Sequence, residues 1–100
     1  MERHRIMVIG SHVATVQRVS TYCLQQNAEV FPYYGIPMNE EITLFAPHIL
    51  VFCLPINEAL EHHSLLQPCI FWSEQPKNED LPSVNTPTEL YTRLQEVLQL

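Results

Sequence analysis

The stretch that most constrains the fold is a run of apolar residues enclosed by two prolines. Between Pro47 and Pro55 the chain reads His-Ile-Leu-Val-Phe-Cys-Leu, and this is its most hydrophobic segment. The run has the length of a strand but lacks the alternation of apolar and polar residues that a sheet with one solvated face requires. The sequence therefore predicts a parallel strand over residues 48–54 that is covered on both faces.

Four further short segments are predicted to be strands: residues 5–9, 28–33, 69–72 and, more briefly, 83–85. The first ends at Gly10 and Ser11, where the chain can turn and Ser11 can cap a following helix. The second contains Pro32, whose missing N–H is tolerated at the edge of a sheet. A polar segment with two prolines over residues 73–82 is predicted to be a loop.

Helical spacing of apolar residues, or a capping signal, predicts four helices: residues 12–27, a short helix ending before Pro47, residues 57–66, and a last helix after residue 86. The last has the clearest signal. Thr86 and Glu89 form a capping box with Pro87 at the first helical position. Its apolar residues follow at helical spacing: Leu90, Leu94, Val97 and Leu98.

The alternation of strands and helices favours a parallel sheet between helical layers, which is a doubly wound α/β fold in three layers. The chain has 100 residues, of which 46% are hydrophobic, enough to bury the core of one domain. We therefore expect a single domain over residues 1–100.

Composition argues against several classes of partner and location. The formal charge of −6 repels nucleic acid and anionic lipid. Pro47 and Pro55 interrupt the longest apolar stretch, so a membrane span is not expected, and the start of the chain does not resemble a signal peptide. The three cysteines have no C-x-x-C spacing and lie in apolar segments, which indicates reduced thiols. We expect a cytoplasmic protein.

In order, these segments resemble a response-regulator receiver domain over nearly the whole chain. The run from Pro47 to Pro55 is similar to the receiver strand that carries the phosphoacceptor aspartate, and Cys53 stands at that position. Ser73, after the fourth strand, matches the switch Ser/Thr, and Thr86 takes the place of the expected lysine. The resemblance implies a five-stranded parallel sheet of order 2-1-3-4-5, with the fourth helix replaced by a loop.

The departures from the receiver pattern concern its chemistry. Where receivers place acidic residues after the first strand, this chain has Gly10 and Ser11, followed by His12. Aspartyl phosphorylation needs a carboxylate nucleophile, carboxylates for Mg²⁺ and a lysine. The chain has one aspartate, Asp80, and one lysine, Lys77, both in the predicted loop. We therefore expect a degenerate pocket that binds no metal or other cofactor.

The resemblance implies a non-catalytic module, of the type called a pseudo-receiver or α-β-loop domain, within a two-component or transcription-regulatory protein. Expected partners are a kinase, a phosphotransfer domain or a transcription factor, and a homodimer is possible. Candidate contact residues are Tyr33, Tyr34 and Ile36 at the end of the edge strand, because aromatic residues are enriched at interface centres. Tyr91 on the last helix is a second candidate surface.

Two alternatives remain open. Cys53, at the end of a central strand, could be the centre of a thiol-based redox sensor or enzyme, with His12 as the only predicted group near enough to lower its pKa. The loops after the first and third strands could instead bind a small ligand such as a nucleotide. The five histidines lack the spacing of a zinc site, so a metal site is not predicted.

Overall fold

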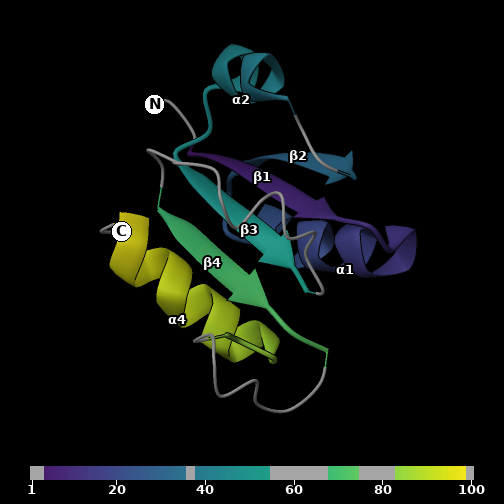
Figure 1. The fold of residues 1–100 in the computed structure, drawn as a ribbon. Helices are drawn as coiled ribbons and strands as arrows, with labels where there is room; N and C mark the ends of the chain where they lie inside the picture. The colour runs from purple at the N-terminus through teal and green to yellow at the C-terminus, as the bar shows by residue number, and fades with distance from the viewer. Residues whose placement is uncertain (1–3, 36–37, 55–67, 75–82, 99–100) are drawn as a thin grey trace.

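The computed structural model of the chain describes residues 4–35, 38–54, 68–74 and 83–98. Strands and helices follow one another as β1 (Arg5–Gly10), α1 (Val13–Leu24), β2 (Glu29–Tyr34), α2 (Asn39–Phe45), β3 (Ile49–Cys53), β4 (Cys69–Trp72) and α4 (Pro87–Leu98). Four strands form one parallel sheet in the order β2-β1-β3-β4 (Figure 1). The predicted α/β class, the parallel sheet and the edge position of β2 are confirmed.

Helices cover both faces of this sheet, as the three-layer prediction requires. On one face, Val16 and Val19 of α1 and Leu90 and Leu94 of α4 are buried against inward side chains of the strands. On the other face, Ile42 of α2 is buried in a second apolar cluster. Figure 1 shows α1 and α4 on one side of the sheet and α2 on the other.

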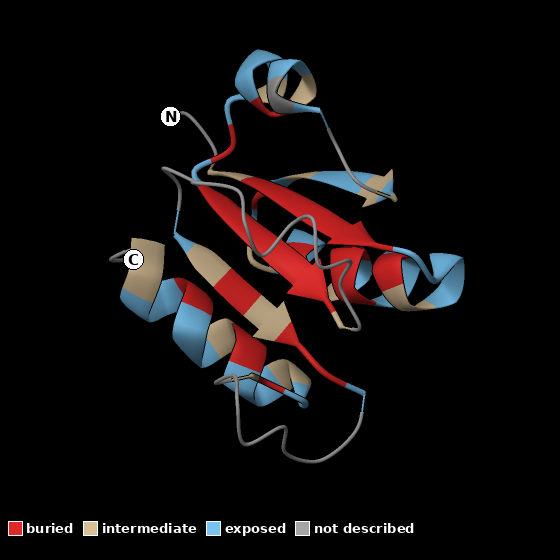
Figure 2. Cartoon of the chain, in the orientation of Figure 1, coloured by how far each residue is buried: buried red, intermediate tan, exposed pale blue. Residues whose placement is uncertain are grey.

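The central strand β3 contributes to both clusters. Its five residues are all buried. Ile49, Val51 and Cys53 belong to the cluster under α1 and α4, whereas Leu50 and Phe52 belong to the cluster on the α2 side. Burial of each large apolar side chain stabilises the fold by roughly 1.5–3 kcal/mol. The unbroken apolar run therefore reflects a strand with no solvated face (Figure 2).

The predicted fifth strand is wrong, because the described residues form four strands and residues 83–85 are not among them. Residues 83–85 contribute only one parallel bridge, between Val84 and Trp72. The Val84 N–H donates to the Phe71 carbonyl at 2.8 Å, and the Ser73 N–H donates to the Val84 carbonyl at 2.9 Å. The segment is too short to extend this pairing, because Thr86 begins to cap α4 two residues later.

The capping role predicted for Ser11 is also wrong. β1 continues through Gly10, one residue further than predicted, so α1 starts at Val13 and its N-cap is His12. The helix also ends earlier than predicted, at Leu24. Asn27 then adopts a left-handed conformation with φ of 58°, which turns the chain into β2. Asparagine is among the residues that tolerate this conformation.

Two predicted segments lie wholly or mostly outside the described residues. These are the third predicted helix, residues 57–66, and the loop expected in place of a fourth helix, of which only Ser73 and Glu74 are described.

Gly10 ends β1 in a tight contact with α1 and β3. A Cβ atom at this position would lie 2.8 Å from Cγ2 of Val16 and 2.9 Å from Cβ of Cys53. Both neighbours are buried side chains that are held by the core. Glycine is therefore required here for packing, because any side chain would displace α1 or β3.

We predict that Gly10→Ala destabilises the protein by about 1–3 kcal/mol, because overpacking a tight core strains its neighbours. Urea unfolding followed by circular dichroism measures the change. Ser11→Ala is the matched control, since the adjacent Ser11 is exposed, and it should change stability by less than about 0.5 kcal/mol. Equal stability of the two variants would show that the contact at Gly10 is not restrictive.

Candidate functional site

The carboxyl ends of β1, β3 and β4 meet at one edge of the sheet, where doubly wound folds place their ligands. β3 and β4 are joined there by the Leu54 N–H, which donates to the Trp72 carbonyl at 2.7 Å. The structure thus brings Gly10, Cys53 and Ser73 to the same edge, as predicted. Ser11 follows Gly10 and is exposed.

The side chain of Cys53 is buried in the core beneath this edge. It is 3% exposed and belongs to the apolar cluster under α1 and α4. Burial raises the pKa of Cys53 to about 12, and the positive charge of Arg18 opposes this shift only in part. The thiol is therefore protonated at neutral pH, and a protonated thiol is a poor nucleophile.

The cation that acts on Cys53 differs from the one the sequence suggests. His12 was the expected neighbour, whereas the structure assigns this influence to Arg18, which lies on α1. The sequence could not show this, because a side chain of α1 reaches the sheet edge only once the helix has packed across β1. Arg18 also forms an ion pair, which limits its effect as a free charge.

The two remaining predicted pocket residues have structural roles. Ser73 is 7% exposed, and its backbone bonds to Val84. Thr86 caps α4, because its hydroxyl oxygen accepts a hydrogen bond from the Glu89 N–H at 3.2 Å. The same hydroxyl donates to the Glu89 carboxylate at 3.1 Å. The predicted helix cap at Thr86 is thus confirmed.

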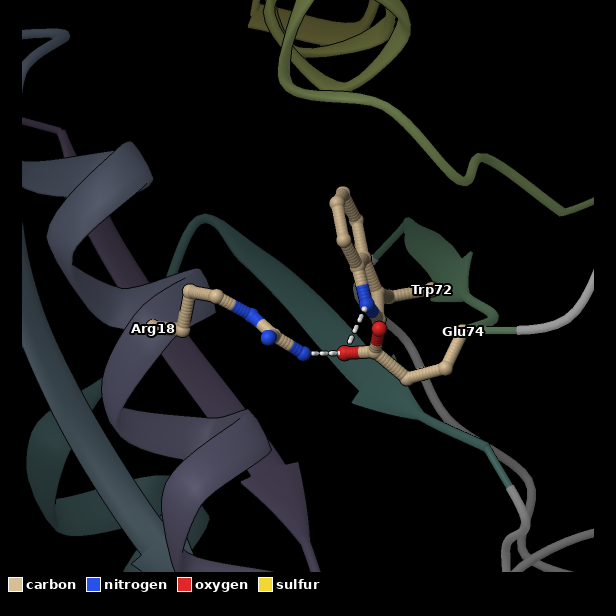
Figure 3. Close-up of polar contacts among 3 residues, drawn as sticks. All are labelled: Arg18, Trp72 and Glu74. Atoms are coloured by element: carbon tan, nitrogen blue, oxygen red, sulfur yellow. Dashed lines mark hydrogen bonds and ion pairs between the residues drawn. The ribbon is translucent and has the colours of Figure 1, made fainter.

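A polar cluster that sequence reasoning missed lies between α1 and the end of β4. Glu74 accepts hydrogen bonds from the Arg18 guanidinium and from the Trp72 indole N–H, the latter at 3.1 Å (Figure 3). Both charged side chains are nearly half exposed, so the ion pair contributes less than about 1 kcal/mol. One sequence signal existed, because a buried tryptophan usually finds a partner for its N–H.

This cluster continues into a seam between α1 and α4. The ring of Tyr22 lies 5.7 Å from that of Trp72, and the Tyr91 hydroxyl donates to the Gln25 side chain at 2.5 Å. Tyr91 is half-buried and takes part in this contact between helices. Its role at an interface with another protein remains a prediction. Because Tyr91 is partly buried, less of its side chain is accessible to a partner than in a fully exposed tyrosine.

Two of the other predicted contact residues, Tyr33 and Tyr34, lie at the end of β2. Tyr33 is half-buried and donates a hydrogen bond to Glu41 at 2.7 Å. This bond is the main cause that raises the pKa of Tyr33 above its usual value. Tyr34 is 46% exposed. Ile36 lies outside the described residues.

The described part of the chain contains neither a group of metal-ligating side chains nor a helix suited to span a membrane. Its His, Cys, Asp and Glu side chains include no group of three or more that could hold a metal ion. Among its helices, none has the length and apolarity needed to cross a membrane.

Comparisons with known proteins identify the fold. No family model matches the chain, and no curated protein matches it. A solved structure of a BeF3-activated DrrB receiver domain superposes with a TM-score of 0.66, and the match covers 100% of each chain. The sequences are 16% identical. The chain therefore has the receiver fold that its sequence predicted, and the low identity limits this finding to the fold.

The cysteines provide a test of how closed the site is. We predict that Cys69, which is half-buried, reacts with iodoacetamide on the order of tenfold faster than Cys23 or Cys53. The pKa of Cys23 is also raised to about 12, mainly by burial. Mass spectrometry of peptides after timed alkylation gives the three rates, and alkylation in urea is the control. Reaction of Cys53 ahead of Cys69 would support the thiol-centred alternative.

The same pKa shifts predict how stability depends on pH. Burial raises the pKa of Cys23 and Cys53 from 9.0 to about 12, so the folded chain holds these protons more tightly than the unfolded chain. Their contribution to stability is complete below about pH 9 and is lost as the pH rises towards 12. Urea unfolding between pH 8 and about 11 should show this fall, and Cys53→Ala should reduce its slope.

Proposed function

We propose that this chain is a signalling module that uses the receiver fold to bind other proteins and is not phosphorylated on aspartate. The likeness to a receiver domain supports the fold, and the chemistry of the sheet edge supports the absence of phosphotransfer. The observation that carries the proposal is the burial of Cys53, the residue that the sequence resemblance aligns with the phosphoacceptor aspartate.

The residues at the sheet edge do not supply the groups that aspartyl phosphorylation needs. The reaction requires a carboxylate nucleophile, carboxylates that hold Mg²⁺ and a cation that neutralises the phosphoryl group. The matching positions hold Gly10, Ser11, Cys53 and Thr86. Among the described residues, Glu74 lies after β4 near this edge, and its carboxylate already bonds to Arg18 and Trp72.

The packing at this edge also opposes the return of those groups. A carboxylate at position 10 would require its Cβ to overlap Val16 and Cys53, which are both buried. A carboxylate at position 53 would enter an apolar cluster, where an ionised group without a partner is strongly destabilising. Positions 10 and 53 are therefore packed as core, and a carboxylate at either position would have to displace buried apolar side chains.

A domain of this kind acts through its surface. Partners that fit the fold are proteins of two-component or transcription-regulatory systems, such as a kinase, a phosphotransfer domain or a transcription factor. The net charge of −6 favours protein partners over nucleic acid. Thiol chemistry at Cys53 is less well supported, because the side chain is 3% exposed.

We predict that incubation with acetyl phosphate and Mg²⁺ adds no phosphoryl group to the protein. Intact-mass spectrometry measures this, with a phosphorylatable receiver domain in the same buffer as the positive control. An adduct that hydroxylamine removes would contradict the proposal, because hydroxylamine cleaves acyl phosphates. The matched variant Asp80→Asn would then show whether the single aspartate of the chain is the acceptor.

A further inference from the structure

The surface formed by β2 and α2 exposes several large apolar side chains and also carries acidic residues. Its large exposed side chains, given with their exposed fractions, are Phe31 at 40%, Met38 at 64% and Leu44 at 86%. Figure 2 shows β2 and α2 largely in the colours of exposed and intermediate residues, in contrast to β3, which is buried throughout, and β1, which is buried after Arg5. We call Glu29, Phe31 and Tyr33 of β2, together with residues 38 and 40–45, the β2–α2 surface.

Side-chain contacts hold the two elements of this surface together. The rings of Phe31 and Phe45 lie 5.1 Å apart, and Tyr33 donates a hydrogen bond to Glu41. Glu41 also accepts from the Met38 N–H at 3.2 Å, at the start of α2. The apolar side chains therefore stand on a fixed frame, which lowers the entropy that binding would cost.

The charge of this surface has one sign. Its ionisable acidic residues are Glu29, Glu40 and Glu41, and its sequence contains no lysine or arginine. Arg5 lies opposite Glu29 where β1 pairs with β2. The Arg5 side chain donates a hydrogen bond to the Ala46 carbonyl at 2.9 Å. A second copy of this chain would bring the same carboxylates face to face, because a two-fold interface pairs a patch with itself. Like charges placed opposite one another disfavour that dimer.

The backbone of β2 disfavours a partner that would extend the sheet. The Glu29 N–H donates to His4 and the Gly35 N–H donates to Gly10, so odd-numbered residues of β2 face β1. Since residues alternate along a parallel pair, Pro32 faces the outer edge, where it offers no N–H. The outer edge of β2 therefore lacks one hydrogen-bond donor at its middle, and a proline placed in this way protects an edge strand from pairing with another strand.

We propose that the β2–α2 surface binds a segment of a partner protein that presents apolar side chains flanked by lysine or arginine. This inference rests on the proposed function and adds to it the chemistry of the partner. Leu44 and Phe31 supply apolar contacts, and Glu40 and Glu29 select the basic flanks. The contact is made by side chains and leaves the outer edge of β2 unpaired.

The experiment uses two synthetic peptides and the whole chain labelled with nitrogen-15. One peptide is an amphipathic sequence of leucine and lysine, and the other has glutamate in place of every lysine. We predict saturable amide shifts confined to β2 and α2 with the lysine peptide, and binding by the glutamate peptide that is weaker on the order of tenfold or more. Added salt should weaken the lysine complex.

Variants locate the contact. Leu44→Ser and Glu40→Lys should each weaken binding of the lysine peptide on the order of tenfold. Leu24→Ser is the matched control, because Leu24 is 56% exposed on α1, on the opposite face of the sheet. It should change affinity by less than about twofold. Circular dichroism checks that the variants are folded, as expected for side chains exposed to this degree.

Several results would overturn the inference: no saturable binding, equal binding of both peptides, shifts centred on α1 or α4, or loss of binding in Leu24→Ser but not in Leu44→Ser. A dimer in sedimentation that Leu44→Ser dissociates would replace the basic partner by a second copy. None of these results changes the acetyl phosphate experiment, so failure of this inference is distinguishable from failure of the proposed function.

Discussion

The structure depends on burial of β3 between two apolar clusters. Its side chains alternate between the face covered by α1 and α4 and the face covered by α2, and none is exposed. β1 and β4 pair with β3 on either side and complete a sheet whose centre is dry. Cys53, the last residue of β3, is part of this burial and serves as core.

Most of the fold could be predicted, because it follows from local patterns. The apolar run of β3, the proline in β2 and the Thr86 cap each act through the backbone or through burial, which sequence periodicity reflects. The prediction of a fifth strand was wrong for a reason that the strand propensity of its residues does not reflect. A strand needs enough residues to continue a ladder, and here the cap of α4 follows Val84 too closely.

The site was less predictable than the fold. The order of the strands was enough to place Gly10, Cys53 and Ser73 at one edge. The Arg18–Glu74 pair joins residues 56 positions apart, on a helix and after a strand. Such a pairing depends on how α1 rotates on the sheet, and no local pattern encodes it. Gly10 is a related case, because the tight contact with Val16 and Cys53 appears only after the helix has packed.

The polar cluster between α1 and the end of β4 has a practical consequence, because it contains the only tryptophan of the chain. Trp72 is 3% exposed, bonds to Glu74 through its indole N–H and lies beside the ring of Tyr22. The protein thus carries an intrinsic fluorophore at the junction of its first helix and its sheet. Emission from this one residue can follow movement of α1 without any added label.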